Sequence, residues 1–135
     1  MHHDDALLGS IQNRSDSLNR MATEASARLS ACAHRLSAAG VGLELVVAST
    51  PLVESMERRL YLGYGRDPHD DQYRILAIGE EFLAAGPVDI RHNIQWASRQ
   101  ARIKADELLT DLLAAINDRL AECLGIDGTA RGDNA

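Results

Sequence analysis

The sequence predicts an α+β domain: a three-stranded antiparallel sheet packed by two long helices, in the order helix, strand, strand, strand, helix. Three observations lead to this fold class. Apolar residues recur every three or four positions over residues 4–39 and 93–124. Between these stretches the period falls to two, as in a strand with one apolar face. Aromatic residues make up only 4% of the 135-residue chain, and a core of Leu, Ala, Ile and Val favours helix packing over a large β-sandwich.

The first element is expected as a helix over residues 4–39. Its apolar positions follow a repeat close to 3.5 residues, which is typical of a helix that packs lengthwise against another. Ser15 interrupts this seam, and Gly9 weakens the first turns, so a start near Ser10 or Ser17 is an alternative. Gly40 is expected to end the helix at the C′ position. The seam consists of Leu8, Ile11, Leu18, Ala22, Ala25, Leu29, Cys32, Leu36 and Ala39.

Three strands are expected next, over residues 41–47, 59–66 and 73–79. The second and third are joined by the loop 67–72, which is rich in turn-forming residues, so they are expected to form a hairpin with a polar tip. The strands contain glycines where side chains would otherwise stand on the sheet. Such glycines indicate close approach of another backbone, which we expect to be a long helix. They are Gly63, Gly65 and Gly79.

The last helix is expected over residues 93–124, with Asp89 or Asn93 as its cap and Gly125 as its stop. Residues 80–85 are expected to add a helical turn before Gly86 and Pro87 break the chain. At 1.5 Å per residue the last helix would span roughly 48 Å. Because a domain of this size is narrower than that, we expect one end to protrude or to meet a second chain.

The chain is expected to hold one domain over residues 1–124 and a disordered tail over residues 125–135. Cys32 and Cys123 fall on apolar helix stripes and are expected as buried free thiols. A disulfide between them would require the two helices to pack side by side.

Composition argues against several classes of protein. The formal charge of −6 disfavours nucleic acid as the main partner, since phosphate binding needs clustered Lys and Arg. No apolar run approaches the roughly 18 residues of a membrane span. The first residues do not resemble the basic start of a secretory signal, so we expect a cytoplasmic protein without membrane contact.

The sequence shows no catalytic, cofactor or metal site that we would assign. His69, Asp70 and Asp71 offer an imidazole and two carboxylates for a metal ion or for acid–base chemistry. Because adjacent loop residues point apart, we interpret them as a polar turn. No triad-like arrangement, Gly-x-Ser-x-Gly stretch or complete phosphate-binding loop occurs.

A basic segment is the candidate interaction surface. It contains Arg91, Arg99, Arg102 and Lys104, with Trp96 among them and no acidic residue between the ends. An aromatic ring beside arginines is a usual ingredient of a contact surface for an acidic protein or for nucleic acid. In the alternative, Trp96 packs on the sheet while Arg99 and Arg102 pair with carboxylates such as Glu80, Glu81 or Glu44.

Three stretches carry a resemblance to a known group of proteins: residues 60–65, 73–78 and 97–105, with Leu108, Leu112 and Leu113. They resemble small bacterial proteins often carried on mobile elements, which share a strand hairpin followed by an Ala-Ser-Arg-x-x-Arg-Ile-x-Ala helix. The resemblance covers roughly the second half of the chain. It implies an α+β fold and no activity.

We therefore expect a non-enzymatic protein-protein interaction protein of bacterial or mobile-element origin. It would act as an accessory or inhibitor of another protein, or pair with itself as a homodimer through protruding helix ends or through the exposed face of the sheet. One alternative is a small-molecule-binding or enzymatic domain with a pocket between sheet and helices, lined by Tyr61, Tyr64, Tyr73 and Trp96. A second alternative is nucleic-acid binding through residues 91–104.

Overall fold

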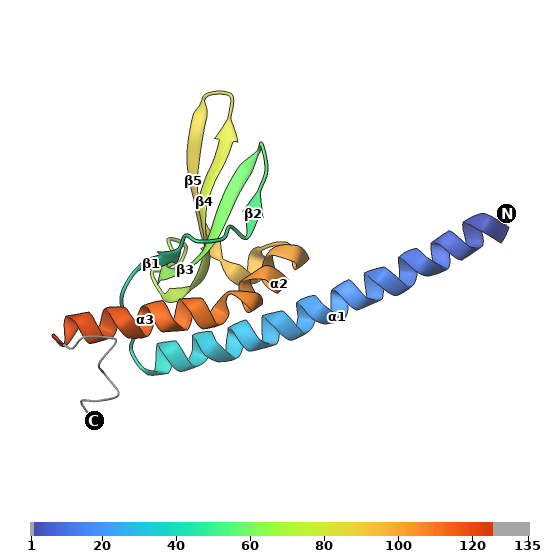
Figure 1. Ribbon diagram of the computed structural model, residues 1–135. Helices are drawn as coiled ribbons and strands as arrows, with labels where there is room; N and C mark the ends of the chain where they lie inside the picture. The colour runs from blue at the N-terminus through green and yellow to red at the C-terminus, as the bar shows by residue number, and fades with distance from the viewer. Residues whose placement is uncertain (1, 126–135) are drawn as a thin grey trace.

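The computed structural model describes residues 2–125 and confirms the α+β class (Figure 1). The described residues form three α-helices, one short 3-10 helix and an antiparallel sheet of five strands, so the expected two helices and three strands were too few. The elements are α1 (His2–Ala38), β1 (Leu45–Val47), β2 (Val53–Glu54), β3 (Arg58–Arg66), β4 (Tyr73–Leu83), β5 (Gly86–Asn93), η1 (Ile94–Trp96), α2 (Arg99–Glu107) and α3 (Leu109–Cys123).

The sheet has the order β1-β3-β4-β5, with β2 as a further neighbour of β3. Val47 lies opposite Leu62, and Val53 lies opposite Leu60, so β1 and β2 pair with successive parts of β3. Together they behave as one edge strand that bends between residues 48 and 52. The predicted first strand was therefore too long at its start, and β2 was missed because it has only two residues.

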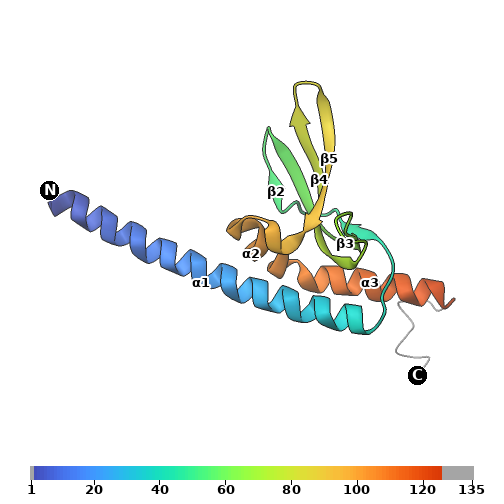
Figure 2. The same ribbon diagram turned by 180° about the vertical axis from the view of Figure 1, so that it is seen from behind.

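The core lies where the helices cover one part of the sheet. α3 contacts β1 and β3, whereas α1 contacts α2 and β4. The far ends of β2 to β5 stand clear of all three helices in both views (Figures 1 and 2). The largest fully buried apolar side chains are Tyr64, Leu29, Leu62, Ile75, Leu76, Ile94 and Leu112.

Residues 80–85 do not form the expected helical turn. β4 continues to Leu83 and reverses into β5, with Gly86 at φ +124°. The extension pairs with β3, where Arg58 and Glu81 form a cross-strand ion pair of 3.0 Å. Strand pairing thus overrides the helix propensity of this stretch, because a free β3 edge offers backbone partners that an isolated helical turn lacks.

The expected helix over residues 93–124 is divided into η1, α2 and α3. Asn93 caps η1 by accepting a hydrogen bond from the Gln95 amide, and Ser98 caps α2 by accepting one from Ala101. Leu108, at φ −94° and ψ 1°, separates α2 from α3. The two breaks redirect the apolar stripe, so α2 can follow α1 while α3 follows the sheet.

The strand glycines are needed for contacts within the sheet, not for the expected approach of a helix. A Cβ on Gly79 would lie 1.9 Å from the Arg59 carbonyl oxygen of the neighbouring strand. A Cβ on Gly65 would meet Glu44 and Arg91, whose ion pair crosses over this position. The sheet therefore folds closely on itself at these two positions.

α1 forms as predicted and ends in a Schellman motif. Gly40 has a φ of +71°, its amide donates to the Ser37 carbonyl, and the Val41 amide donates to the Leu36 carbonyl. The N-terminal half of α1 extends beyond every other element (Figures 1 and 2). We expected the last helix to protrude, and the protruding helix is instead the first.

The two cysteines are free. Cys32 is half-buried, whereas Cys123 is exposed near the end of α3, so the expectation of two buried thiols was wrong for Cys123.

Candidate interaction surface

The protruding part of α1, residues 3–18, is called the arm below. Every side chain from residue 3 to residue 14 is exposed, and the first buried residue of the helix is Ala22, at 2%. Its sixteen helical residues rise about 24 Å, so the arm reaches well beyond the body. Leu8 and Ile11 are 62% and 60% exposed. Large apolar side chains thus lie on the arm without cover from the described residues.

The exposed apolar residues of the arm continue a seam that is buried farther along the same helix. Positions 8, 11, 15, 18, 22, 25 and 29 alternate in steps of three and four, which is the a/d pattern of a coiled coil. Ala22, Ala25 and Leu29 are at most 2% exposed. Leu7 and Met21 lie beside the seam on one side and add to its exposed apolar surface, since they are 51% and 49% exposed. One seam therefore has a covered half and an uncovered half.

Local polar contacts support the arm as a helix. Asp4 and Asp5 lie in the first turn, where negative charge is favourable for the helix dipole. Gln12 donates a hydrogen bond of 2.9 Å to Asp16 one turn later. Such contacts contribute only a few tenths of a kcal/mol each, so they leave the arm a marginal helix without a packing partner.

Two arginines of the predicted basic segment fasten α2 to α1. Arg99 donates to the Asn19 side chain, and Arg102 donates to Ser26 Oγ at 2.7 Å. Asp106 accepts from Arg28 Nε at 2.8 and 2.9 Å. The alternative that Arg99 and Arg102 pair with sheet carboxylates was wrong in its partners, because both arginines point to α1.

The other two basic residues lie against carboxylates. Arg91 forms an ion pair with Glu44 and donates to the Arg66 carbonyl at 3.1 Å. Lys104 lies 3.3 Å from Glu107 one helical turn ahead. The structure therefore distributes the basic segment over the sheet and α2, and it compensates two of the four charges locally.

Trp96 packs with two histidine rings. His69, from the loop between β3 and β4, meets the indole edge-on with ring centroids 4.9 Å apart. His92 lies roughly parallel to the indole at 6.4 Å. Trp96 nevertheless remains 61% exposed, so an open aromatic surface lies beside the start of α2. The sequence could not predict this cluster, because the three residues meet only through the hairpin fold.

Asp67 organises the loop that carries His69. It is the one buried charged residue of the described chain, and its Oδ1 accepts from the His69 amide at 3.0 Å and from His69 Nδ1 at 2.9 Å. Burial alone would raise the pKa of Asp67, but the hydrogen bonds from His69 outweigh it and lower the pKa. Sequence reasoning considered Asp70 and Asp71 as partners of His69, whereas the structure pairs it with Asp67.

Asp70 and Asp71 stabilise the same turn in other ways. Asp70 pairs with Arg74, which lowers the pKa of its carboxyl, and it also accepts from the Gln72 amide at 3.1 Å. Asp71 adopts a φ of +66°. Within residues 2–125, no group of three or more His, Cys, Asp or Glu side chains is arranged to hold a metal ion.

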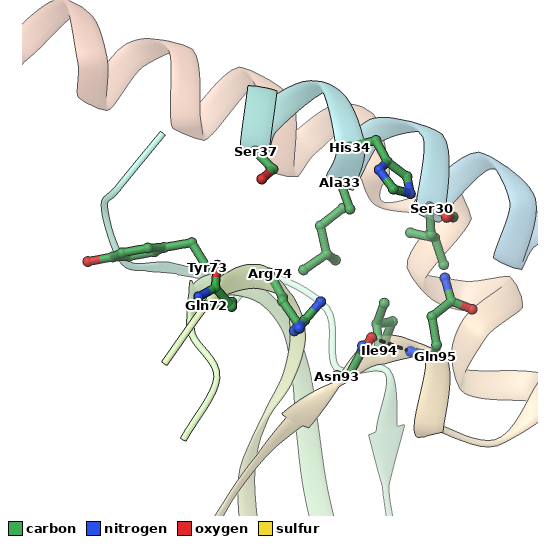
Figure 3. A pocket seen from close by; sticks show the side chains of 12 residues that line it. Ser30, Ala33, His34, Ser37, Gln72, Tyr73, Arg74, Asn93, Ile94 and Gln95 are labelled. Atoms are coloured by element: carbon green, nitrogen blue, oxygen red, sulfur yellow. Dashed lines mark hydrogen bonds between the residues drawn. The ribbon is translucent and has the colours of Figure 1, made fainter. Parts of the chain in front are cut away.

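A cavity of about 220 Å³ lies between α1 and the junction of β4, β5 and η1 (Figure 3). Its floor is apolar, with Leu29, Ile75 and Ile94, whereas its rim is mostly polar. Of the aromatic residues expected to line such a pocket, it contains Tyr73 only. The rim residues include Ser30, His34, Ser37, Gln72, Arg74, Asn93 and Gln95.

Two polar side chains at the rim of the cavity already have partners within the chain, which leaves fewer groups to bind a ligand. Arg74 is already paired with Asp67 and Asp70, and Gln95 donates to the Ser26 carbonyl at 3.1 Å. Its volume is also below the roughly 300 Å³ at which ligand pockets usually begin. Among the described residues, the arm is the more prominent candidate site.

Comparisons with known proteins add no relative to this description. No family model matches the chain, and neither the curated proteins nor the solved structures contain a significant match. None of the described helices has both the length and the apolar character needed to cross a bilayer.

Proposed function

We propose that this protein is a non-enzymatic interaction protein that acts as a homodimer through the arm of α1. The observation that carries the proposal is the uncovered half of the α1 seam, where Leu8 and Ile11 are about 60% exposed. Exposed apolar residues that are contiguous on one face of an element mark contact surfaces more often than scattered ones do. A second copy is a suitable occupant because the seam has the a/d spacing with which α-helices pair.

Two further features support an interaction role. No side chain of the arm is buried, so the arm gains less from packing on the body than the rest of α1 does, and a partner would stabilise it as a helix. The far ends of β4 and β5 also stand free, with Phe82, Leu83 and Val88 between 39% and 50% exposed. An accessory or inhibitor role for the dimer, and an origin in bacteria or mobile elements, remain predictions from the sequence.

The test compares two single substitutions two residues apart on the arm. Ile11→Glu places a charge in the seam, whereas Asn13→Glu places the same charge on the opposite face of the helix. Sedimentation equilibrium over a range of concentrations should show a dimer for the unsubstituted chain and for Asn13→Glu, and a monomer for Ile11→Glu. Far-UV circular dichroism confirms that each variant remains folded.

Two results would contradict the proposal. The unsubstituted chain could remain a monomer at millimolar concentration, or Ile11→Glu could dimerise as tightly as Asn13→Glu. In the second case the dimer would use another surface, such as the free ends of β4 and β5.

Small-molecule binding is a second candidate function, because the cavity beneath α1 exists and has a polar rim. Thermal-shift screening against metabolites should then reveal a ligand whose effect is lost in His34→Ala, since His34 lies on the exposed rim. His3→Ala, far along the arm, is the matched control. A flat screen would count against this candidate.

Nucleic-acid binding has less support. Arg91 and Lys104 are each paired with a carboxylate, which reduces the local positive charge available to phosphates. The candidate predicts a salt-dependent affinity that is lost in Arg99→Glu with Arg102→Glu. Binding unchanged by this double substitution would exclude the predicted segment.

A further inference from the structure

We infer that two copies of this chain pair their arms antiparallel, with Asp5 of each copy lying against Asn19 and Arg99 of the other. The inference rests on the proposed dimer and specifies its geometry. Three observations lead to it: the symmetry of the apolar residues, the cover that α2 gives to the rest of the seam, and the placement of charge near Asn19.

The uncovered part of the seam can pair with a second copy of itself around a two-fold axis that passes near Asn13. In an antiparallel pair each a position faces a d position of the other helix, so Leu8 meets Leu18 and Ile11 meets Ser15. The Ser15 that interrupts the seam therefore lies opposite a large side chain and leaves room for it. A two-fold interface requires this reciprocity, because the same two residues must fit each other twice.

The flanks of the seam repeat this symmetry. With Leu8 at an a position and Ile11 at a d position of the heptad, residues 7, 14 and 21 are g positions and residues 5, 12 and 19 are e positions. The g positions of two antiparallel helices lie next to each other. Leu7 of one copy therefore packs beside Met21 of the other. These two side chains, which are about half exposed in the single chain, become covered in the pair.

A parallel pair fits the fold less well. In a parallel pair, the second helix would continue from Leu18 toward Ala22 and Ala25, which are already covered. α2 occupies that side of α1, as its bonds from Arg99 to Asn19 and from Arg102 to Ser26 show. A parallel pair would also place Ser15 opposite Ser15. The antiparallel pair uses the part of the seam, from Leu8 to Leu18, in which no side chain is buried.

Charge complementarity favours the same arrangement. Asp5 and Asn19 both occupy the e side, and they are opposite each other in this register. Asn19 accepts a hydrogen bond from Arg99, so the guanidinium lies where the Asp5 carboxylate of the second copy arrives. Each dimer contains this contact twice. The predicted interaction residue Arg99 thereby joins the interface, with the exposed Trp96 close to it on the chain.

Arg14 supplies a feature that distinguishes the two orientations. It occupies the g side at the centre of the arm, so in the antiparallel pair it lies beside Arg14 of the second copy. In a parallel pair it would face the neutral Asn19. Removing the charge should therefore tighten an antiparallel dimer, by about twofold for one exposed like-charge pair, and should leave a parallel dimer unchanged.

The contact is short: the whole dimer has four seam layers and two flanking pairs of Leu7 with Met21, half of each on either side of the two-fold axis. Such an interface is smaller than the standard size of about 1,600 Å². We therefore expect a dissociation constant in the micromolar range, which makes dimerisation sensitive to protein concentration.

Disulfide trapping tests the orientation. The experiment uses the full chain with Cys32→Ala and Cys123→Ser, to which either Leu8→Cys or Leu18→Cys is added, one of the two carrying a tag that changes its size. Under mild oxidation, an equimolar mixture should give the mixed disulfide, while each variant alone should give little. A parallel pair would cross-link each variant with itself.

Charge reversal tests the predicted contact. Asp5→Lys and Arg99→Glu should each weaken the dimer about threefold, as expected for exposed ion pairs, and the two substitutions together should restore it. Asp16→Lys, on the outer face of the arm, is the control and should leave the dimer unchanged.

The outcomes separate the two proposals. Self-cross-linking of each variant, with Arg14→Gln as tight as the unsubstituted chain, would overturn the antiparallel geometry and leave the homodimer intact. A monomer under all conditions would overturn both. Mixed cross-linking without rescue in the Asp5→Lys and Arg99→Glu combination would retain the orientation and exclude the charged contact.

Discussion

The two halves of α1 carry the same seam and differ in what covers it. Between Ala22 and Leu29 the seam is buried under α2 and the sheet, whereas Leu8 and Ile11 are about 60% exposed and Ser15 and Leu18 are half-buried. The sequence of the helix is continuous across this change. The comparison shows that a heptad pattern specifies a face that needs a partner, while the rest of the fold decides whether that partner lies in the same chain.

The largest expected effect is a difference in the loss of stability when a leucine is truncated in the two halves of α1. Leu29→Ala removes a side chain with 0% exposure and should lower the free energy of unfolding by about 3 kcal/mol. Leu8→Ala, the same substitution in the arm, should change it by less than about 0.5 kcal/mol in the monomer. Urea unfolding at low protein concentration measures both. Equal losses would show that the arm packs against the body.

The second-largest effect is expected at Asp67, in the loop between β3 and β4. Gln72 and Arg74, at the end of this loop and the start of β4, face α1 across the cavity. Asp67→Ala leaves the His69 donors without their acceptor and should cost about 2 kcal/mol. Asp67→Asn retains an acceptor and should cost less. Thermal unfolding at pH 7 gives the two values, and the opposite order would contradict the assigned hydrogen bonds.

The Asp67 carboxylate also makes the folding stability of the protein depend on pH. Its pKa is lower in the folded chain than in the unfolded chain, so its contribution to stability is present above the unfolded value of about 3.9 and is lost as the pH falls through the folded value. Unfolding followed between pH 7 and pH 2 should therefore show a shallower loss of stability in Asp67→Asn than in the unsubstituted chain. Parallel curves would exclude Asp67 as a source of the acid sensitivity.

A smaller effect is expected for the bonds that hold α2 on α1. Arg102→Ala loses the donations to Ser26 at 2.7 Å and to the Ala97 carbonyl at 3.2 Å and should cost about 1 kcal/mol. Arg14→Ala removes an arginine from the arm, where its bond to Ser10 is exposed, and should cost little. Denaturant midpoints distinguish the two, and similar shifts would indicate that Arg102 contributes nothing specific.

The smallest effect is confined to the arm. A Cβ on Gly9 meets no heavy atom within 4 Å, so Gly9→Ala should stabilise the arm helix by up to about 1 kcal/mol. The helical circular dichroism signal should rise while the midpoint of global unfolding stays constant, because an uncovered arm frays independently of the body. A raised midpoint at low concentration would instead indicate that arm and body unfold together.

Several elements could be predicted because their signals are local. The period of α1, its stop at Gly40, the hairpin of β3 and β4 and the polar loop between them follow from spacing and turn chemistry. The expected basic segment exists in sequence, but its members divide between the sheet and α2 once the chain folds. Its role as an interaction surface remains a prediction.

Other features depended on contacts between distant residues. Residues 80–83 carry helix-forming side chains and become strand because β3 and β5 offer them backbone groups to pair with. Trp96 meets His69 only because the β3–β4 loop folds back onto η1.

By itself, then, the sequence determined which stretches have an apolar face and where the chain turns, since both follow from side-chain period and backbone preference. The tertiary structure alone decided that α2 covers one half of the α1 seam and leaves Leu8 and Ile11 uncovered. The physical reason is that an apolar face is buried only when a second surface packs against it. The pattern along one helix identifies the first surface, and only the folded structure shows whether the chain supplies the second.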